Sequence, residues 1–429
     1  MIKYNQKNLV GQLIFRQIVD LIPKDKFIDL VYKLQADRYY KTFFAWDQLI
    51  TLLYGIYSRC DSMGEVCDSM RALGGKLNHL GMDIAPAKST VGDALRERTN
   101  ELYRLFFFVL LEHFAPDLSV SRKNKYRKTA ISIKNLFAFD STTISLFSDI
   151  LKGVSRNTEG DGKKKGGLKV HMVTDIHADT PVFALITDAK TNDQKLLDHL
   201  KLPTGSMATF DRGYNNYKYF AKLTEDGVYF VTRLKDDANY QVIGEPIFEI
   251  ELKEGEFGVY KEEHIHLQYD DPTPYQDKGL NEVTLWGRKK TLCLRLVHYR
   301  DEKGRYYRFI TNNWDITSEE VALIYKYRWT IETTFKKLKQ NFQLTYFYSD
   351  SENGIKTQVW CTLIAYLLLL VVETISESTK ALSTIAALIR MHLISHLSLF
   401  WVVTEGRIAY PKNIKSRNKS PTVIQYSAF

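Results

Sequence analysis

Cysteine is scarce in this chain, with four residues among 429. No two of them form a Cys-x-x-Cys pair, and none has histidines at the spacing of a zinc site. A disulfide framework and a structural zinc site are therefore not predicted, and a reducing cytoplasm is the compartment that fits this cysteine usage. The four residues are Cys60, Cys67, Cys293 and Cys361.

Long apolar runs are also missing. The most apolar segment, residues 359–372, is shorter than the roughly 20 residues that cross a membrane, so it predicts a buried helix and no membrane partner. Residues 1–7 lack the apolar core of a signal peptide. An apolar fraction of 45% and a charged fraction of 25% are those of an ordinary globular protein. The length predicts roughly two to four domains.

Acidic residues are fewer than basic ones, 50 against 59, which gives a net charge of +9 at pH 7. This excess favours a polyanionic partner, although charge alone does not separate nucleic acid from a membrane surface or from mere solubility. Residues 121–128 are strongly basic and are interpreted first as a linker. The glycine and lysine loop at 156–167 fits either a phosphate contact or a flexible hairpin connection.

The spacing of apolar residues divides the chain into an all-α part followed by an α/β part. Residues 7–116 carry apolar side chains at helical spacing, with no strand alternation. Within this part, residues 61–70 and 89–98 could form a helix-turn-helix in which Arg96 and Arg98 read DNA. The alternative is that these arginines belong to the solvated face of an ordinary helical bundle.

From residue 135 onward strands and helices alternate, which predicts a mixed sheet of the ribonuclease H type. The expected strands are residues 137–146, 167–175, 182–186, 208–211 and 228–233, with helices at 193–199 and 217–223. A β-rich insertion follows, with strands at 240–243, 247–252, 257–260, 282–286 and 292–297, and then helices at 359–373 and 384–402. The predicted parts are a helical N-terminal DNA-binding domain (1–118), a basic linker (119–128), an α/β core in two pieces (129–235 and 309–410), the β-rich insertion (236–308) and a disordered basic tail (411–429).

One helical segment carries an unusual set of functional side chains. At about 100° per residue, Tyr325, Arg328, Glu332 and Lys339 fall within about 60° of one another and share one stripe. Apolar residues of the same segment provide a separate packing side. The alternative is that Glu332 makes ordinary helix pairs with Arg328 and Lys336, worth a few tenths of a kcal/mol.

Two aspartates, Asp140 and Asp211, end apolar strand segments, where an unpaired buried charge costs several kcal/mol. A divalent cation offsets that cost, since Mg²⁺ prefers hard oxygen ligands. If the two strands are neighbours and the Glu332 helix crosses them, three acids could hold two ions that serve a phosphoryl displacement. The alternative for each aspartate is an ordinary turn after a strand.

The spacing Tyr325-x2-Arg328-x3-Glu332-x6-Lys339 resembles the YREK signature of the insertion-sequence four family of DDE transposases. The sequences around Asp140 and Asp211 resemble the family's first two acidic motifs, and the helical region before residue 116 resembles its N-terminal domain. The resemblance implies DNA transposition on a ribonuclease H-like core. It also implies that Asp140, Asp211 and Glu332 are catalytic and bind two Mg²⁺ or Mn²⁺ ions.

The resemblance further implies that Arg328 and Lys339 hold DNA phosphates and that Tyr325 positions the strand end. Lys336 and Arg212 are predicted to assist in DNA binding. Lys169 and His171 also match a recurrent pattern of the family and are expected near the acid of the first strand. For His171 the alternative is a hydrogen-bonded histidine of the core.

The expected partners are terminal inverted repeats and target DNA, bridged by a homodimer in the bacterial nucleoid. A hairpin intermediate would need a pocket for a flipped base, with Trp286, Trp314 and Trp329 as open choices. Two rival functions remain: a catalytically silent DNA-binding protein derived from a transposase, and a metal-dependent nuclease without strand transfer.

Overall fold

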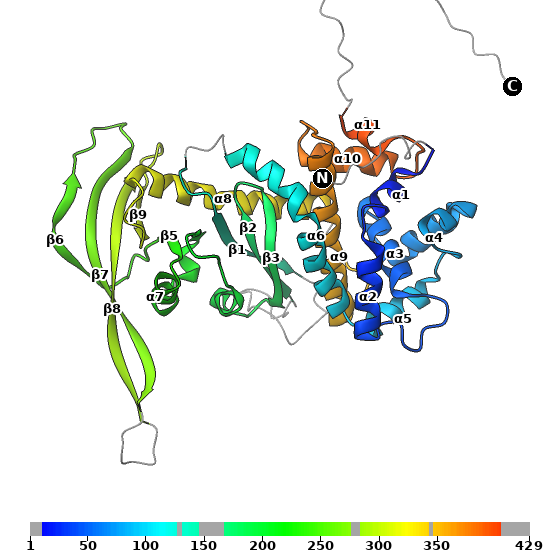
Figure 1. Ribbon diagram of the computed structural model, residues 1–429, viewed down its shortest axis with the longest axis horizontal. Helices are drawn as coiled ribbons and strands as arrows, with labels where there is room; N and C mark the ends of the chain where they lie inside the picture. Colours follow the sequence, from blue (N-terminus) through cyan, green and yellow to red (C-terminus); the bar gives the residue numbers. More distant parts are fainter. Residues whose placement is uncertain (1–10, 127–130, 146–166, 276–283, 343–345, 405–429) are drawn as a thin grey trace, which may run out of the picture.

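The computed structural model describes residues 11–126, 131–145, 167–275, 284–342 and 346–404. The basic tail, most of the loop at 156–167 and residues 127–128 lie outside these ranges. The N-terminal part is helical, as the sequence predicts (Figure 1). Its elements are α1 (Ile14–Val19), α2 (Lys24–Leu34), α3 (Ala45–Ser58), α4 (Met63–Ala72), the 3-10 helix η2 (Gly74–Leu80), α5 (Lys88–Glu97) and α6 (Glu101–Tyr126).

Two details of this region differ from the prediction. Helix α6 continues through residues 119–126, which the sequence assigns to a linker, so this stretch is not an irregular connection. Arg98, expected on a DNA-reading or solvated face, has a fully buried side chain at the end of α5. Its guanidinium donates hydrogen bonds to the loop before α3, which satisfies a charge that could not otherwise be buried.

The α/β part has the predicted ribonuclease H-like topology. Strand β1 (Leu136–Ser145) pairs antiparallel with β2 (Gly167–Asp175), which pairs antiparallel with β3 (Thr180–Asp188). On its other side β1 pairs in parallel with β4 (Met207–Phe210), and β4 pairs in parallel with β5 (Tyr229–Arg233). The strands begin and end within two residues of the predicted positions, because buried apolar residues mark them.

The β-rich insertion extends the same sheet beyond β5 in the order β9, β8, β7, β6. Its strands are β6 (Tyr240–Glu249), β7 (Gly258–Tyr275), β8 (Thr284–Arg300) and β9 (Tyr306–Thr311). The sequence predicts shorter strands here and misses β9. Asp270 and Pro272 read as turn residues, but they lie inside a long two-stranded ribbon that projects away from the rest of the molecule (Figure 1).

Helices cover both faces of the first five strands. Helix α8 (Ser318–Asn341) lies against β1, β4 and β5, while α7 (Tyr217–Glu225) and the 3-10 helix η3 (Asp193–His199) pack on the opposite face. A capping box of Thr317 and Glu320 starts α8. Asp179 then accepts hydrogen bonds from Thr334 (3.1 Å) and Lys337 (2.7 Å), which ties the helix to the β2–β3 turn.

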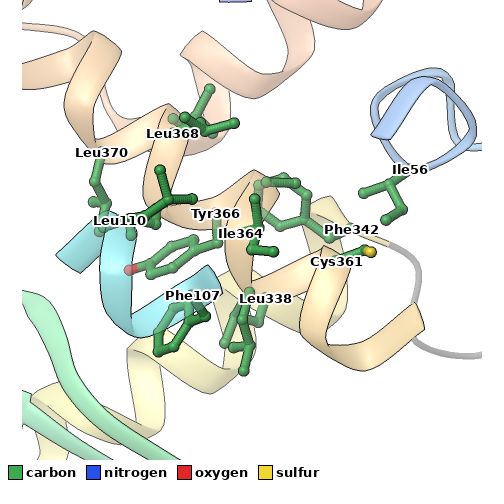
Figure 2. Close-up of a cluster of buried hydrophobic side chains, with 14 of the residues drawn as sticks. Ile56, Phe107, Leu110, Leu338, Phe342, Cys361, Ile364, Tyr366, Leu368 and Leu370 are labelled. Atoms are coloured by element: carbon green, nitrogen blue, oxygen red, sulfur yellow. The ribbon is translucent and has the colours of Figure 1, made fainter. Parts of the chain in front are cut away.

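Helix α9 (Glu352–Ile375) is the centre of the core between the helical part and the sheet. Figure 2 shows Tyr366 and Cys361 of this helix among Phe107 of α6 and Leu338 of α8. By length and composition α9 could cross a membrane, but 83% of its most apolar window is buried inside the protein. The prediction of a buried helix is confirmed, although the helix is longer than expected.

The prediction of a single C-terminal helix at 384–402 is wrong, because the structure has two helices in this region. They are α10 (Leu382–His392) and α11 (Leu399–Thr404). Between them the backbone accepts hydrogen bonds from the start of the chain: Phe15 N–H donates to Leu393 O (2.9 Å) and Ile14 N–H to Ser395 O (3.1 Å). These long-range contacts compete with continuation of the helix.

Candidate active site

Two parallel strands place the two aspartates side by side. The register of β1 and β4 pairs Phe139 with Phe210, and both side chains are fully buried with ring centroids 5.8 Å apart. Asp140 is the next residue of β1, and Asp211 is the first residue after β4. Because neighbouring strands lie about 4.8 Å apart, the two carboxylates leave the sheet at adjacent positions.

Helix α8 brings the third acid to the same place. Arg328 Nη1 donates to Asp140 Oδ2 (3.3 Å), and Arg328 Nη2 donates to Glu332 Oε1 (2.7 Å). The hydroxyl of Tyr325, one turn earlier, donates to Asp211 Oδ1 (3.5 Å), and its ring lies 5.7 Å from the Arg328 guanidinium. Three acids separated by up to 192 residues in the sequence thus belong to one network around Arg328.

Arg328 and Tyr325 link the three acids in this structure. Among the described residues, no group of three His, Cys, Asp or Glu side chains lies close enough together to hold an ion. The donor set nevertheless fits Mg²⁺ or Mn²⁺, since it consists of carboxylate oxygens, and those of Asp140 and Glu332 already share a cation. Arg328 contacts one oxygen of each carboxylate, Asp140 Oδ2 and Glu332 Oε1, so an ion bound there would share these acids with the guanidinium or compete with it for them.

An open cavity of about 430 Å³ lies beside this network, between β1 and α8. Asp140 and Glu332 line it together with Lys336 and Lys339. Lys339 Nζ donates to the carbonyl of Thr143 (3.2 Å), and burial lowers the pKa of this lysine. Acids and lysines around one open space are the groups that bind a metal ion and a phosphate together.

The pKa of Asp140 is raised from 3.8 to about 6, chiefly by burial. The Ser141 N–H and Arg328 oppose this shift, while Glu332 and Asp211 add to it. A raised pKa means that the folded state binds the proton more tightly than the unfolded state. The protein is therefore most stable, with respect to this group, below pH 4 and loses that stability as the pH rises through about 6.

Asp140→Asn is accordingly expected to stabilise the metal-free protein at neutral pH by about 2–3 kcal/mol. The Asn side chain has a similar shape and cannot ionise, so the gain should be complete above pH 6 and vanish below about pH 4. Thermal unfolding in a chelator, recorded across this pH range for both proteins, measures it. A gain that did not change with pH would contradict the assignment to Asp140.

Lys169 and His171 do not share the side of the sheet that Asp140 faces. The β1–β2 register places His171 opposite Ser141 and Lys169 opposite Thr143, whereas Asp140 lies opposite Met172. Directly paired residues point to the same face. The prediction that both residues lie near this acid is therefore wrong, since they project to the face opposite α8.

A buried polar cluster occupies that opposite face. His171 is fully buried, and its Nε2 lies 2.8 Å from Thr187 Oγ1, which agrees with the alternative of a hydrogen-bonded core histidine. Lys169 Nζ donates to Thr191 O (3.0 Å) and lies 3.1 Å from Asp193 Oδ1, which also accepts from Ser141 Oγ (2.7 Å). Burial lowers the pKa of His171 to about 4, so the ring is neutral at pH 7.

Asp193 and Asp179 are the residues that sequence reasoning missed. Asp193 joins η3 to β1 and β2, and Asp179 sets the position of α8. Both are single acids in turns or at helix starts, and no motif surrounds them. Only the tertiary structure reveals their partners.

The remaining predicted residues lie around the edge of the site. Arg212 follows Asp211 and is exposed, with Nη1 donating to Asp236 Oδ2 (3.0 Å). Trp329 lines a second cavity, of about 480 Å³, between α8 and the insertion. Trp314 instead contacts His264, with ring centroids 4.8 Å apart, and the side chain of Trp286 lies outside the described part.

Comparison with known proteins gives two family matches. The transposase DDE domain family matches residues 132–368, which contain Asp140, Asp211 and Glu332. A domain of unknown function (DUF4372) matches residues 10–83. The first match covers the sheet, the insertion and α8, and the second covers the first helices of the N-terminal part.

Individual relatives are distant. A putative transposase, y4zB, of Sinorhizobium fredii is 27% identical over 213 residues, which are 50% of this chain and 55% of that protein. The probable transposase of insertion sequence element IS5377 from Geobacillus stearothermophilus is 23% identical and covers 66% of this chain and 69% of the relative. A cryo-EM structure of a piggyBac transposase synaptic complex with hairpin DNA has a TM-score of 0.43 and 11% identity, covering 92% of this chain and 82% of that one.

Proposed function

Because the chain belongs to the transposase DDE domain family, which matches more than half of its length, we propose that it is a metal-dependent transposase. It would excise an insertion sequence at terminal inverted repeats and join it to target DNA, acting as a dimer that bridges two DNA ends. The observation that carries this proposal is the network in which Arg328 bridges Asp140 and Glu332 beside Asp211.

In this proposal Asp140, Asp211 and Glu332 hold two Mg²⁺ or Mn²⁺ ions. When bound, such ions activate the attacking oxygen and stabilise the leaving one. The protein's own side chains position the DNA: Lys336 and Lys339 line the open cavity and neutralise phosphate charge, and Tyr325 orients the strand end against Asp211. The Arg328 guanidinium contacts both Asp140 and Glu332 and so offsets the repulsion between these two acids.

The test is to incubate purified full-length protein with Mg²⁺ and DNA that carries both ends of the flanking element. Nicked ends, hairpinned ends and joined products that all require Mg²⁺ support transposition. Binding without any cleavage supports the silent DNA-binding protein instead. Hydrolysed ends that never join to target DNA support a nuclease.

Lys339→Ala is expected to weaken binding to DNA and to lower the slope of log K against log salt by about 1, because one phosphate contact is lost. Helix α8 should tolerate the change, since alanine favours helices. Fluorescence anisotropy over a salt series measures both quantities. Lys337→Ala is the matched control for charge, since Lys337 lies on the same helix and pairs with Asp179 of the β2–β3 turn. An unchanged slope for Lys339→Ala would refute the contact.

For the reaction pathway, we propose a hairpin intermediate whose flipped base enters the cavity beside Trp329. Tyr307 and Tyr325 also line this cavity, together with Lys326, a cation suited to the base's phosphate, and Arg305, which is paired with Asp301 (2.7 Å). Aromatic rings provide stacking worth about 1–3 kcal/mol per base. Of Trp314 and Trp329, the two candidates whose side chains the structure describes, Trp329 has the neighbours that such a pocket needs.

Trp329→Ala is therefore expected to reduce hairpin formation roughly tenfold or more while first-strand nicking continues, because only the flipped base needs the ring. Denaturing gels that separate nicked from hairpinned ends measure the two steps. Trp314→Ala provides the control, since Trp314 is similarly exposed and lies against His264. Equal loss of nicking and hairpins in Trp329→Ala would contradict the pocket.

A further inference from the structure

The loop between α2 and α3, residues 35–44, places an exposed aromatic ring at a strained backbone position. Tyr39 adopts φ 73°, a left-handed conformation that disfavours a bulky side chain, and its side chain is 86% exposed. A glycine would make the same turn without strain. An exposed aromatic ring in a strained position points to contact with something outside the protein.

The loop is held rigidly from beneath by the buried side chain of Arg98. Its guanidinium donates to Ala36 O (3.1 Å), to Phe43 O (2.8 Å) and to Asp37 Oδ1 (3.1 Å), and it stacks on the ring of Tyr40 at 3.9 Å. Asp37 also accepts the Ala45 N–H at 2.7 Å. The one acid of the loop is thus neutralised inside, and both ends of the loop are fixed.

The outer surface of the loop carries positive charge and aromatic rings. Arg38 and Lys41 are exposed, and the Arg38 guanidinium lies 4.9 Å from the Tyr39 ring centroid. Tyr32, at the end of α2, is 77% exposed, and Phe44 is 43% exposed. Cations interleaved with exposed rings are the groups that bind a nucleic-acid backbone.

We propose that this loop, within the domain of unknown function, is a preformed contact for duplex DNA, with Arg38 and Lys41 on phosphates and Tyr39 against the backbone. This inference rests on the proposed function for its ligand. It replaces the helix-turn-helix predicted from α4 and α5, because Arg98 faces inward and Arg96 is paired with Asp93. The buried arginine shapes the DNA contact instead of making it.

Two double variants of the full-length protein test the location. Arg38→Ala with Lys41→Ala removes the loop's charge, and Arg71→Ala with Arg96→Ala removes the same charge from the exposed faces of α4 and α5. The probe is a labelled duplex of the DNA that flanks the gene, titrated in a chelator by anisotropy over a salt series. We expect the loop variant to bind roughly tenfold more weakly, with a salt slope lower by about 2, and the α4–α5 variant to bind like the wild type. Equal losses in both variants would overturn the proposal.

Tyr39→Gly separates binding from folding. Glycine relieves the backbone strain, so the melting temperature should equal or exceed that of the wild type while affinity for the duplex falls. Unchanged affinity would remove Tyr39 from the contact. Cleavage with Mg²⁺ is measured in parallel. If the wild type binds through the loop but does not cleave, only the proposed function is refuted. If the wild type cleaves and the loop variant binds normally, only the role of the loop is refuted.

Discussion

Asp211→Asn is expected to reduce Mg²⁺-dependent cleavage of the element ends roughly 10³-fold or more, the scale of losing one member of a catalytic unit. The amide keeps the shape of the carboxylate but loses its charge, so it is a poor ligand for a hard cation. Its oxygen can still accept the hydrogen bond of the Tyr325 hydroxyl, which lies 3.5 Å from Asp211 Oδ1. The fold and the affinity for DNA should therefore change little.

Asp236→Asn is the matched control for this experiment. Asp236 is an exposed carboxylate that pairs with Arg212 (3.0 Å), outside the network of Arg328. The substitution makes the same change in charge and should leave cleavage intact. Gel assays of nicked ends, together with anisotropy for binding, measure both variants. Cleavage retained by Asp211→Asn would refute its role as a ligand, and loss in both variants would indicate an effect of charge alone.

The two strands and the helix that hold the site residues could be predicted from the sequence, because the spacing of apolar residues along each segment determines them. The buried aromatics Phe139 and Phe210 end the two apolar strand segments, so the acids that follow had to lie at strand positions where charge is costly. Helical spacing also predicts the pair of Arg328 and Glu332, and their side chains lie 2.7 Å apart. That Asp140 shares the same guanidinium is a tertiary contact that spacing could not predict.

The side of the sheet that Lys169 and His171 face could not be predicted for a related reason. It depends on the register between β1 and β2, and a shift of one residue moves every side chain to the other face. Nothing local in either strand fixes that register. Arg98 is expected at the surface from the sequence, because arginine is seldom fully buried. Its burial depends on four hydrogen-bond acceptors around the guanidinium, which only the tertiary structure brings together.

Arg328→Gln is expected to raise the affinity for Mg²⁺ while lowering cleavage. In the wild type the guanidinium bridges Asp140 and Glu332, so an arriving ion must compete with a cation already in place. Without the guanidinium, Asp140 loses its ion pair with Arg328, and the metal-free protein should lose about 3 kcal/mol of stability at neutral pH. Mg²⁺ should restore more of the melting temperature in this variant than it adds to the wild type.

Cleavage should nevertheless fall roughly 100-fold in Arg328→Gln, because a planar guanidinium is suited to a phosphate once the carboxylates have taken up metal. Arg328→Lys separates the two contributions, since it keeps the charge and loses the fork geometry. The Lys variant should keep most of the stability and the weak metal response, yet cleave poorly. Melting curves over a Mg²⁺ series, compared with cleavage rates at saturating Mg²⁺, distinguish the outcomes. If Arg328→Gln cleaved normally once saturated with Mg²⁺, the arginine would act only as a substitute for the ion.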